Sequence, residues 1–134
     1  MPADPKNAQG ARIILTPRAP APIGPYSQAV DTGGFLFVSG QIPLDPEGGG
    51  VVGEGIEAQA EAALANLREV LAAAGLTFAN LVKTTVFIRD MGDFSRFNQV
   101  YQSALGGAAP ARSVVEVSAL PRGVLVEIEA VAWR

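Results

Sequence analysis

Arginine and glutamate residues alternate with apolar residues near the end of the chain, in a pattern that could bind and hydrate a small acid. Arg112 and Glu116 lie in one segment rich in valine, and Glu127 and Glu129 lie in the next. A guanidinium can hold a planar carboxylate through two parallel hydrogen bonds. A glutamate can activate or orient water when its site holds the pKa near the working pH. The same residues could equally form exposed ion pairs between strands, which contribute little stability, and spacing alone does not decide between these interpretations.

Three other segments carry polar side chains that could line such a site. Tyr26 follows four prolines between residues 17 and 25, which forbid helix and central strand and therefore favour a stiff, extended loop. Ser39 and Gly40 follow an apolar run, and Asn98 lies in an expected helix. Taken singly, each has a simpler explanation: a packed aromatic ring, the end of a strand, and a polar residue on a helix surface.

The composition excludes several classes of chemistry. The 134 residues include no Cys and no His, which removes disulfides, thiol nucleophiles, His-ligated zinc and His-based triads. Ten Lys and Arg against thirteen Asp and Glu give a net charge of −3, so nucleic acid is not an expected partner. No run reaches the roughly 18 apolar residues of a membrane span, and the N-terminus lacks a signal core. We therefore expect a cytoplasmic protein with no membrane association.

The elements that must position these residues follow from periodicity and turn signals. Apolar residues at helical spacing predict two helices, β-branched runs predict strands, and Gly33-Gly34 predicts a hairpin. The expected strands are residues 13–15, 29–32, 35–39, 81–89, 112–118 and 124–133, and the expected helices are residues 56–74 and 93–105. The continuous apolar run at residues 35–39 predicts an inner strand covered on both faces.

The order β-β-β-α-β-α-β-β predicts an α+β fold, in which a single mixed sheet carries two helices packed on one face. The length fits one domain over residues 1–134. Residues 1–11 are expected to form a polar N-terminal extension.

Side-chain alternation along the last two strands predicts which side of the sheet the helices cover. The expected core-facing residues are Ile128, Ala130 and Ala132 in the last strand, and Val115 and Val117 in the strand before. The residues expected to face away are Glu127, Glu129, Val131 and Trp133, with Arg112, Val114 and Glu116. A face that mixes apolar and charged side chains should not simply face water, so we expect it to pack against another subunit.

Five short motifs occur in order along the chain, and together they resemble the RidA family, also called YjgF/YER057c/UK114. They are IGPYSQA at residues 23–29, VSGQIP at 38–43, VKTTVF at 82–87, PARS at 110–113 and VEIEA at 126–130. Each motif alone is weak, but five in order, within a resemblance that covers residues 12–134, make a specific signal. The resemblance implies a chorismate-mutase-like fold and a homotrimer with three sites in the clefts between subunits.

The activity that this resemblance implies is that of a 2-iminobutanoate/2-iminopropanoate deaminase. Pyridoxal-phosphate dehydratases release the enamines 2-aminoacrylate and 2-aminocrotonate, which tautomerise to imines. Hydrolysis of these imines gives a 2-keto acid and ammonia, and so protects the cell from reactive metabolites. The reaction requires no metal and no organic cofactor.

The resemblance also implies roles for individual residues. Arg112 matches the carboxylate-binding arginine, and Glu127 matches the acid that places or activates water. The residues that match the substrate-binding positions are Tyr26, Ser39, Gly40, Asn98 and Val114. Val114 stands where the family archetype often has Cys, and imine hydrolysis needs no thiol at this position.

Two other functions stay open at this stage. A non-enzymatic regulatory protein could use the same Arg112 site to sense 2-keto acids. Some relatives are instead described as RNA-directed endoribonucleases or translation inhibitors. The net charge of −3 and the lack of His argue against the RNA-directed role, although neither excludes a local basic patch.

Overall fold

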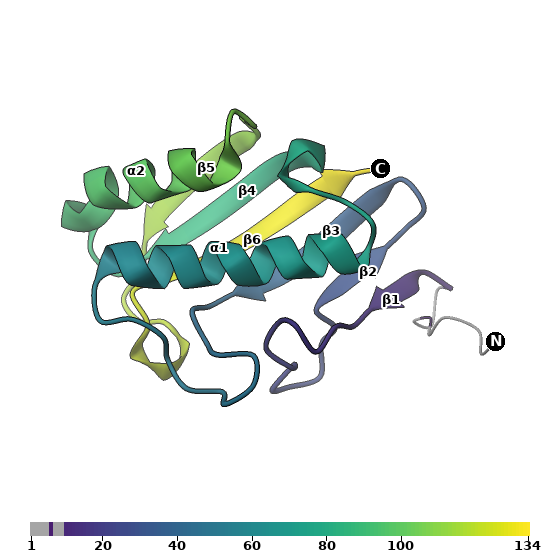
Figure 1. Ribbon diagram of the computed structural model, residues 1–134, viewed down its shortest axis with the longest axis horizontal. Helices are drawn as coiled ribbons and strands as arrows, with labels where there is room; N and C mark the ends of the chain where they lie inside the picture. Colours follow the sequence, from purple (N-terminus) through teal and green to yellow (C-terminus); the bar gives the residue numbers. More distant parts are fainter. Residues whose placement is uncertain (1–5, 7–9) are drawn as a thin grey trace.

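The computed structural model describes residue 6 and residues 10–134; residues 1–5 and 7–9, in the expected N-terminal extension, lie outside the described part. Within that described part the chain folds into one six-stranded mixed sheet with two α-helices on one face (Figure 1). The elements are β1 (Arg12–Ile14), β2 (Ala29–Asp31), β3 (Phe35–Gln41), α1 (Ile56–Ala73), β4 (Leu81–Ile88), α2 (Phe94–Leu105), β5 (Ala111–Glu116) and β6 (Val126–Trp133). The predicted α+β order is confirmed, with short 3-10 turns added at Phe78–Asn80, Met91–Asp93 and Pro121–Gly123.

The strand order in space is β1-β2-β3-β6-β4-β5. The pairs β1/β2, β2/β3, β3/β6 and β4/β6 are antiparallel, and β4/β5 is parallel because α2 connects the two strands as a crossover. β4 therefore lies between β5 and β6, although β5 and β6 follow each other in the sequence. This order places β5 at the edge of the sheet.

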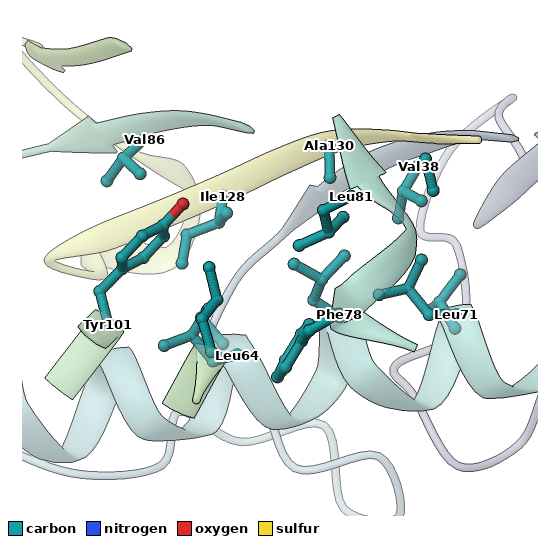
Figure 2. Packing of buried hydrophobic residues seen from close by; sticks show 14 of the residues in the cluster. Val38, Leu64, Leu71, Phe78, Leu81, Val86, Tyr101, Ile128 and Ala130 are labelled. Carbon is teal, nitrogen blue, oxygen red and sulfur yellow. The ribbon is translucent and has the colours of Figure 1, made fainter. Parts of the chain in front are cut away.

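The core fills the space between the sheet and the helices. α1 buries one apolar stripe, which includes Leu64 and Leu71, and α2 buries Tyr101. Figure 2 shows Leu64 and Tyr101 directed toward Ile128 and Val86 of the sheet. Burial of one such aliphatic side chain contributes roughly 1.5–3 kcal/mol. The helix-facing prediction for β6 is confirmed, because Ile128, Ala130 and Ala132 are all buried.

β3 departs from its prediction. The strand alternates, with Leu36 and Val38 buried, whereas Phe35 and Phe37 are 45% and 51% exposed. β3 is an inner strand between β2 and β6, as predicted. The predicted cover on both of its faces is not present within one chain, because both helices pack on the same side of the sheet (Figure 1). The second face of β3 is apolar and open.

β5 corrects a second prediction. Arg112 and Val114 were expected to face away from the helices, but they pair with Thr84 and Val86, two fully buried residues of β4. Paired residues on neighbouring strands share a face, so Arg112 and Val114 lie on the helix side. Val115, expected in the core, is 41% exposed.

The rest of this segment follows the same correction. Glu116 Oε1 accepts a hydrogen bond of 2.8 Å from the Met91 N–H, which begins the turn before α2. Glu116 therefore reaches the helix side, too. Val117, expected in the core, lies beyond the end of β5 and is half-buried.

The open sheet face is the side of the sheet without helices. Its members on β3, β4, β5 and β6 include Phe35, Phe37, Lys83, Thr85, Phe87, Ala111, Ser113, Val115, Glu127, Glu129, Val131 and Trp133. The Phe35 ring stacks on Trp133 with centroids 6.1 Å apart, and Trp133 is 61% exposed.

Among the described helices, none has the length and apolar character of a membrane span.

Candidate active site

Arg112 lies on the edge strand and points beneath α2. The helix ends at Gly106, whose φ of +62° is left-handed and favours glycine, and the chain then turns back into β5. The Arg112 Cζ atom lies 4.8 Å from the centroid of the Tyr101 ring and 5.7 Å from that of Phe94. Its Nη1 donates a 2.7 Å hydrogen bond to Asn98 Oδ1. One helix therefore supplies both the aromatic contacts and the hydrogen-bond acceptor that hold the guanidinium.

Two cavities meet at Arg112. One of about 440 Å³ is lined by Met91, Phe94, Arg112 and Val114. The other, of about 410 Å³, is lined by Arg112 with Tyr101, Gln102 and residues 107–110. A guanidinium has five N–H donors, and one is donated to Asn98. The first cavity combines this cation with apolar walls, so it could hold a small acid that carries an apolar side chain.

Glu127 lies on the open sheet face, next to a glycine that leaves space for it. A Cβ atom built on Gly40 would lie only 2.0 Å from Glu127 Oε2, which is impossible for a real side chain. The pairing of β3 with β6 shifts between Val38 and Gln41, and a bulge of this kind redirects nearby side chains. The Glu127 carboxylate therefore occupies the space that a side chain at position 40 would fill.

The surroundings of Glu127 change its acidity. Burial raises the pKa of the Glu127 carboxyl above its ordinary value, and the neighbouring Glu129 carboxylate raises it further. Both causes disfavour the charged form. A carboxyl that exchanges its proton closer to neutral pH is better suited to general acid–base chemistry.

The loop that carries Tyr26 is tied to the same end of β3. Ser39 Oγ donates a 2.6 Å hydrogen bond to the Ser27 carbonyl oxygen. The Tyr26 hydroxyl accepts a 3.3 Å hydrogen bond from the Ile23 N–H, and the Tyr26 side chain is half exposed. Ser39 adjoins Gly40, so the end of this loop lies beside Gly40 and the Glu127 carboxylate.

The predicted site residues thus form two groups. The arginine half-site is Arg112, Asn98 and Val114, and the glutamate half-site is Glu127, Gly40, Ser39 and Tyr26. Arg112 faces the helices and Glu127 faces the open side, and β4 lies between their strands. The expectation that Arg112 and Glu127 share one face of the sheet is therefore wrong, and a single chain does not bring the two half-sites together.

Three residues outside the five motifs also form part of the arginine half-site. The rings of Phe94 and Tyr101 both contact the guanidinium. Met91 lines the first cavity. Their signal was available in the spacing, because residues 94, 98 and 101 repeat at helical intervals and must share one face of α2.

Comparison with known proteins identifies the family. The family model described as Endoribonuclease L-PSP matches residues 16–134. The chain belongs to this family, and it is a RidA (YjgF/YER057c/UK114) protein, as its motifs predicted. The mouse 2-iminobutanoate/2-iminopropanoate deaminase is 50% identical over 121 residues, which cover 90% of each chain.

Solved structures agree with this RidA assignment. Escherichia coli TdcF with bound serine has a TM-score of 0.88 and 44% identity, over 92% of this chain and 98% of that one. The Escherichia coli YjgF gene product has the same TM-score and 45% identity, over 92% and 98% of the two chains. The names of proteins in this family include both endoribonuclease and 2-iminobutanoate/2-iminopropanoate deaminase, so family membership alone does not specify the activity.

Proposed function

We propose that this RidA protein is a 2-iminobutanoate/2-iminopropanoate deaminase. The observation that carries the proposal is the presence, on one chain, of two complementary and separate half-sites. One presents a guanidinium beside an apolar cavity, and the other presents a carboxyl of raised pKa. The mouse relative of that name, at 50% identity, supports the same reaction.

The site is completed by a second subunit. Arg112 and Glu127 lie on opposite sides of the sheet, so they can act on one substrate only when two chains meet. The open sheet face carries Phe35, Phe37 and Trp133, whose rings contact one another and are about half exposed. An apolar patch of this kind marks an interface. A homotrimer would place three sites in the clefts between subunits.

Substrate binding begins at Arg112. Its free N–H groups form two parallel hydrogen bonds with the substrate carboxylate. Phe94, Tyr101 and Asn98 fix the guanidinium beforehand, so less conformational entropy is lost on binding. Small apolar side chains, such as those of 2-iminopropanoate and 2-iminobutanoate, fit the apolar walls of the first cavity.

Glu127 of the neighbouring subunit then directs the hydrolysis. Its carboxylate accepts a proton from water as the water oxygen attacks the iminium carbon, which gives a carbinolamine. Glu127 delivers this proton to the nitrogen, and it then takes the hydroxyl proton as the C–N bond breaks, so that the hydroxyl becomes the carbonyl of the 2-keto acid and ammonia is released. Ammonia takes up the proton held by Glu127 and leaves as ammonium, which returns Glu127 to its starting carboxylate. All of these steps use water and side chains alone.

A coupled assay tests this function. A purified pyridoxal-phosphate threonine or serine dehydratase generates the imine in solution, and keto-acid release is followed with and without this protein. We expect the protein to accelerate release. If release is unchanged although the protein binds 2-oxobutanoate, the keto-acid sensor is the better description. If RNA is degraded while release is unchanged, the endoribonuclease description is the better one.

A further inference from the structure

A buried pair of hydroxyl groups lies directly beside Arg112. Thr84 is fully buried in β4, and it is the residue that pairs with Arg112 across the parallel ladder. Its Oγ1 lies 2.8 Å from the Tyr101 hydroxyl, and either oxygen can donate the hydrogen bond. Tyr101 comes from α2, so this bond joins the helix to the strand next to Arg112.

Tyr101 is fixed at both ends. Its hydroxyl is held by Thr84, and its ring packs against Phe97 with centroids 5.6 Å apart. The face of this ring carries the Arg112 guanidinium at 4.8 Å. A Phe and a Val would fill nearly the same space. Burying two hydroxyls instead removes them from water, and this cost is offset only while they are hydrogen-bonded to each other. The hydroxyl pair therefore does more than fill the core: it fixes the plane on which the guanidinium rests.

We propose that Tyr101, held by Thr84, is a positioning residue that sets the orientation of Arg112 for carboxylate binding. This inference rests on the proposed function, in which Arg112 anchors the substrate carboxylate. Tyr101 sets the plane of the guanidinium through stacking, and Asn98 sets its rotation within that plane through the hydrogen bond to Nη1. A guanidinium that must donate to two carboxylate oxygens at once is sensitive to both its plane and its rotation within that plane.

The test measures the Kd of 2-oxobutanoate by calorimetry, beside the Tm, for Tyr101→Phe, Thr84→Val and the double variant. Each single change leaves one buried hydroxyl without its partner, so the Tm falls. The double change removes both partners and keeps the shape, which restores most of the stability. In all three variants the aromatic ring at position 101 lacks the hydrogen bond that holds it. We therefore expect the Kd of 2-oxobutanoate to rise about 3- to 10-fold in each, the range expected for one lost hydrogen bond.

Two controls separate positioning from simple stability. Val70→Ala, in the buried stripe of α1, lowers the Tm and leaves Kd unchanged. Arg112→Lys weakens binding in otherwise intact protein. If Kd returns to the wild-type value in the double variant, or never changes, the pair is merely structural and the inference is wrong. If Arg112→Lys binds as tightly as wild type, the carboxylate anchor itself is wrong and both proposals fail.

Discussion

At the scale of single residues, the tightest steric contact in the site is between Gly40 and the Glu127 carboxylate. Any side chain at position 40 would overlap the Glu127 carboxylate. Gly40→Ala should therefore displace this carboxylate and lower imine hydrolysis about 10²-fold, because displacements of about 1 Å have effects of this size. Gly50→Ala is the matched control, since a Cβ there meets nothing within 4 Å. Equal rates of imine hydrolysis in both variants would contradict the role of Gly40 in leaving space for the Glu127 carboxylate.

Glu127→Gln separates an enzyme from a sensor. The amide keeps the shape of the side chain but cannot accept a proton from water. Hydrolysis should fall about 10²- to 10⁴-fold, the usual contribution of general acid–base catalysis, while calorimetric binding of 2-oxobutanoate persists. Glu129→Gln removes a more exposed carboxyl on the same face and should have a smaller effect. Full turnover by Glu127→Gln would favour the sensor.

At the scale of secondary structure, one ion pair connects three elements. Arg134 Nη2 donates to Asp31 Oδ2 at the end of β2 and to the Ala74 carbonyl at the end of α1. Burial alone would raise the pKa of Asp31, but the Gly33 N–H and the Arg134 guanidinium outweigh it, with a further contribution from Arg12, and the pKa is lowered. The charged form of Asp31 therefore stabilises the fold.

Asp31→Asn should lower the free energy of unfolding at pH 7 by about 1 kcal/mol, a value reduced by the partial exposure of Arg134. Because the folded pKa lies below the ordinary value of 3.8, this contribution is complete above that pH and disappears as the pH falls through the folded pKa. Denaturant titrations of both proteins at pH 7 and near pH 2.5 measure the difference. A difference that persists unchanged at the lower pH would exclude the charge of Asp31 as its cause.

The predictability of each element followed from how clear its side-chain pattern was. The stripe of α1 and the Gly33-Gly34 hairpin are local signals, and both predictions are confirmed. The two faces of β5 were predicted the wrong way round. Val114 and Val115 point to opposite faces and are equally apolar, so the side-chain pattern does not show which face is buried. Its orientation depends on parallel pairing with β4, a long-range contact that alternation within one segment does not encode.

The candidate site shows the same division. The motifs located Arg112, Glu127, Asn98 and Gly40, and the structure joins them in two pairs, Arg112 with Asn98 and Glu127 with Gly40. The motifs did not show that the two pairs lie on opposite sides of the sheet. That separation depends on the strand order, in which β4 comes between β6 and β5. The inferred need for a second subunit thus comes from the topology.

At the scale of the whole molecule, the open sheet face should be covered in solution. Sedimentation at micromolar concentration should give about three times the chain mass of 13.9 kDa. Phe37→Asp places a charge within the aromatic patch and should shift the protein toward monomer, with loss of hydrolysis and little change in circular dichroism. A wild-type monomer at this concentration would contradict both the trimer and the shared site.

The most direct measurement mixes two inactive variants. Arg112→Ala lacks the arginine half-site, and Glu127→Gln lacks the glutamate half-site. After the two proteins are unfolded together at equal concentration and refolded, each mixed trimer contains one cleft in which an intact Arg112 of one subunit meets an intact Glu127 of its neighbour. Random mixing should make about a quarter of the clefts wild type, so keto-acid release should recover to about that fraction. If the mixture stays as inactive as its parents while sedimentation shows refolded trimers, the site does not form between subunits in this way.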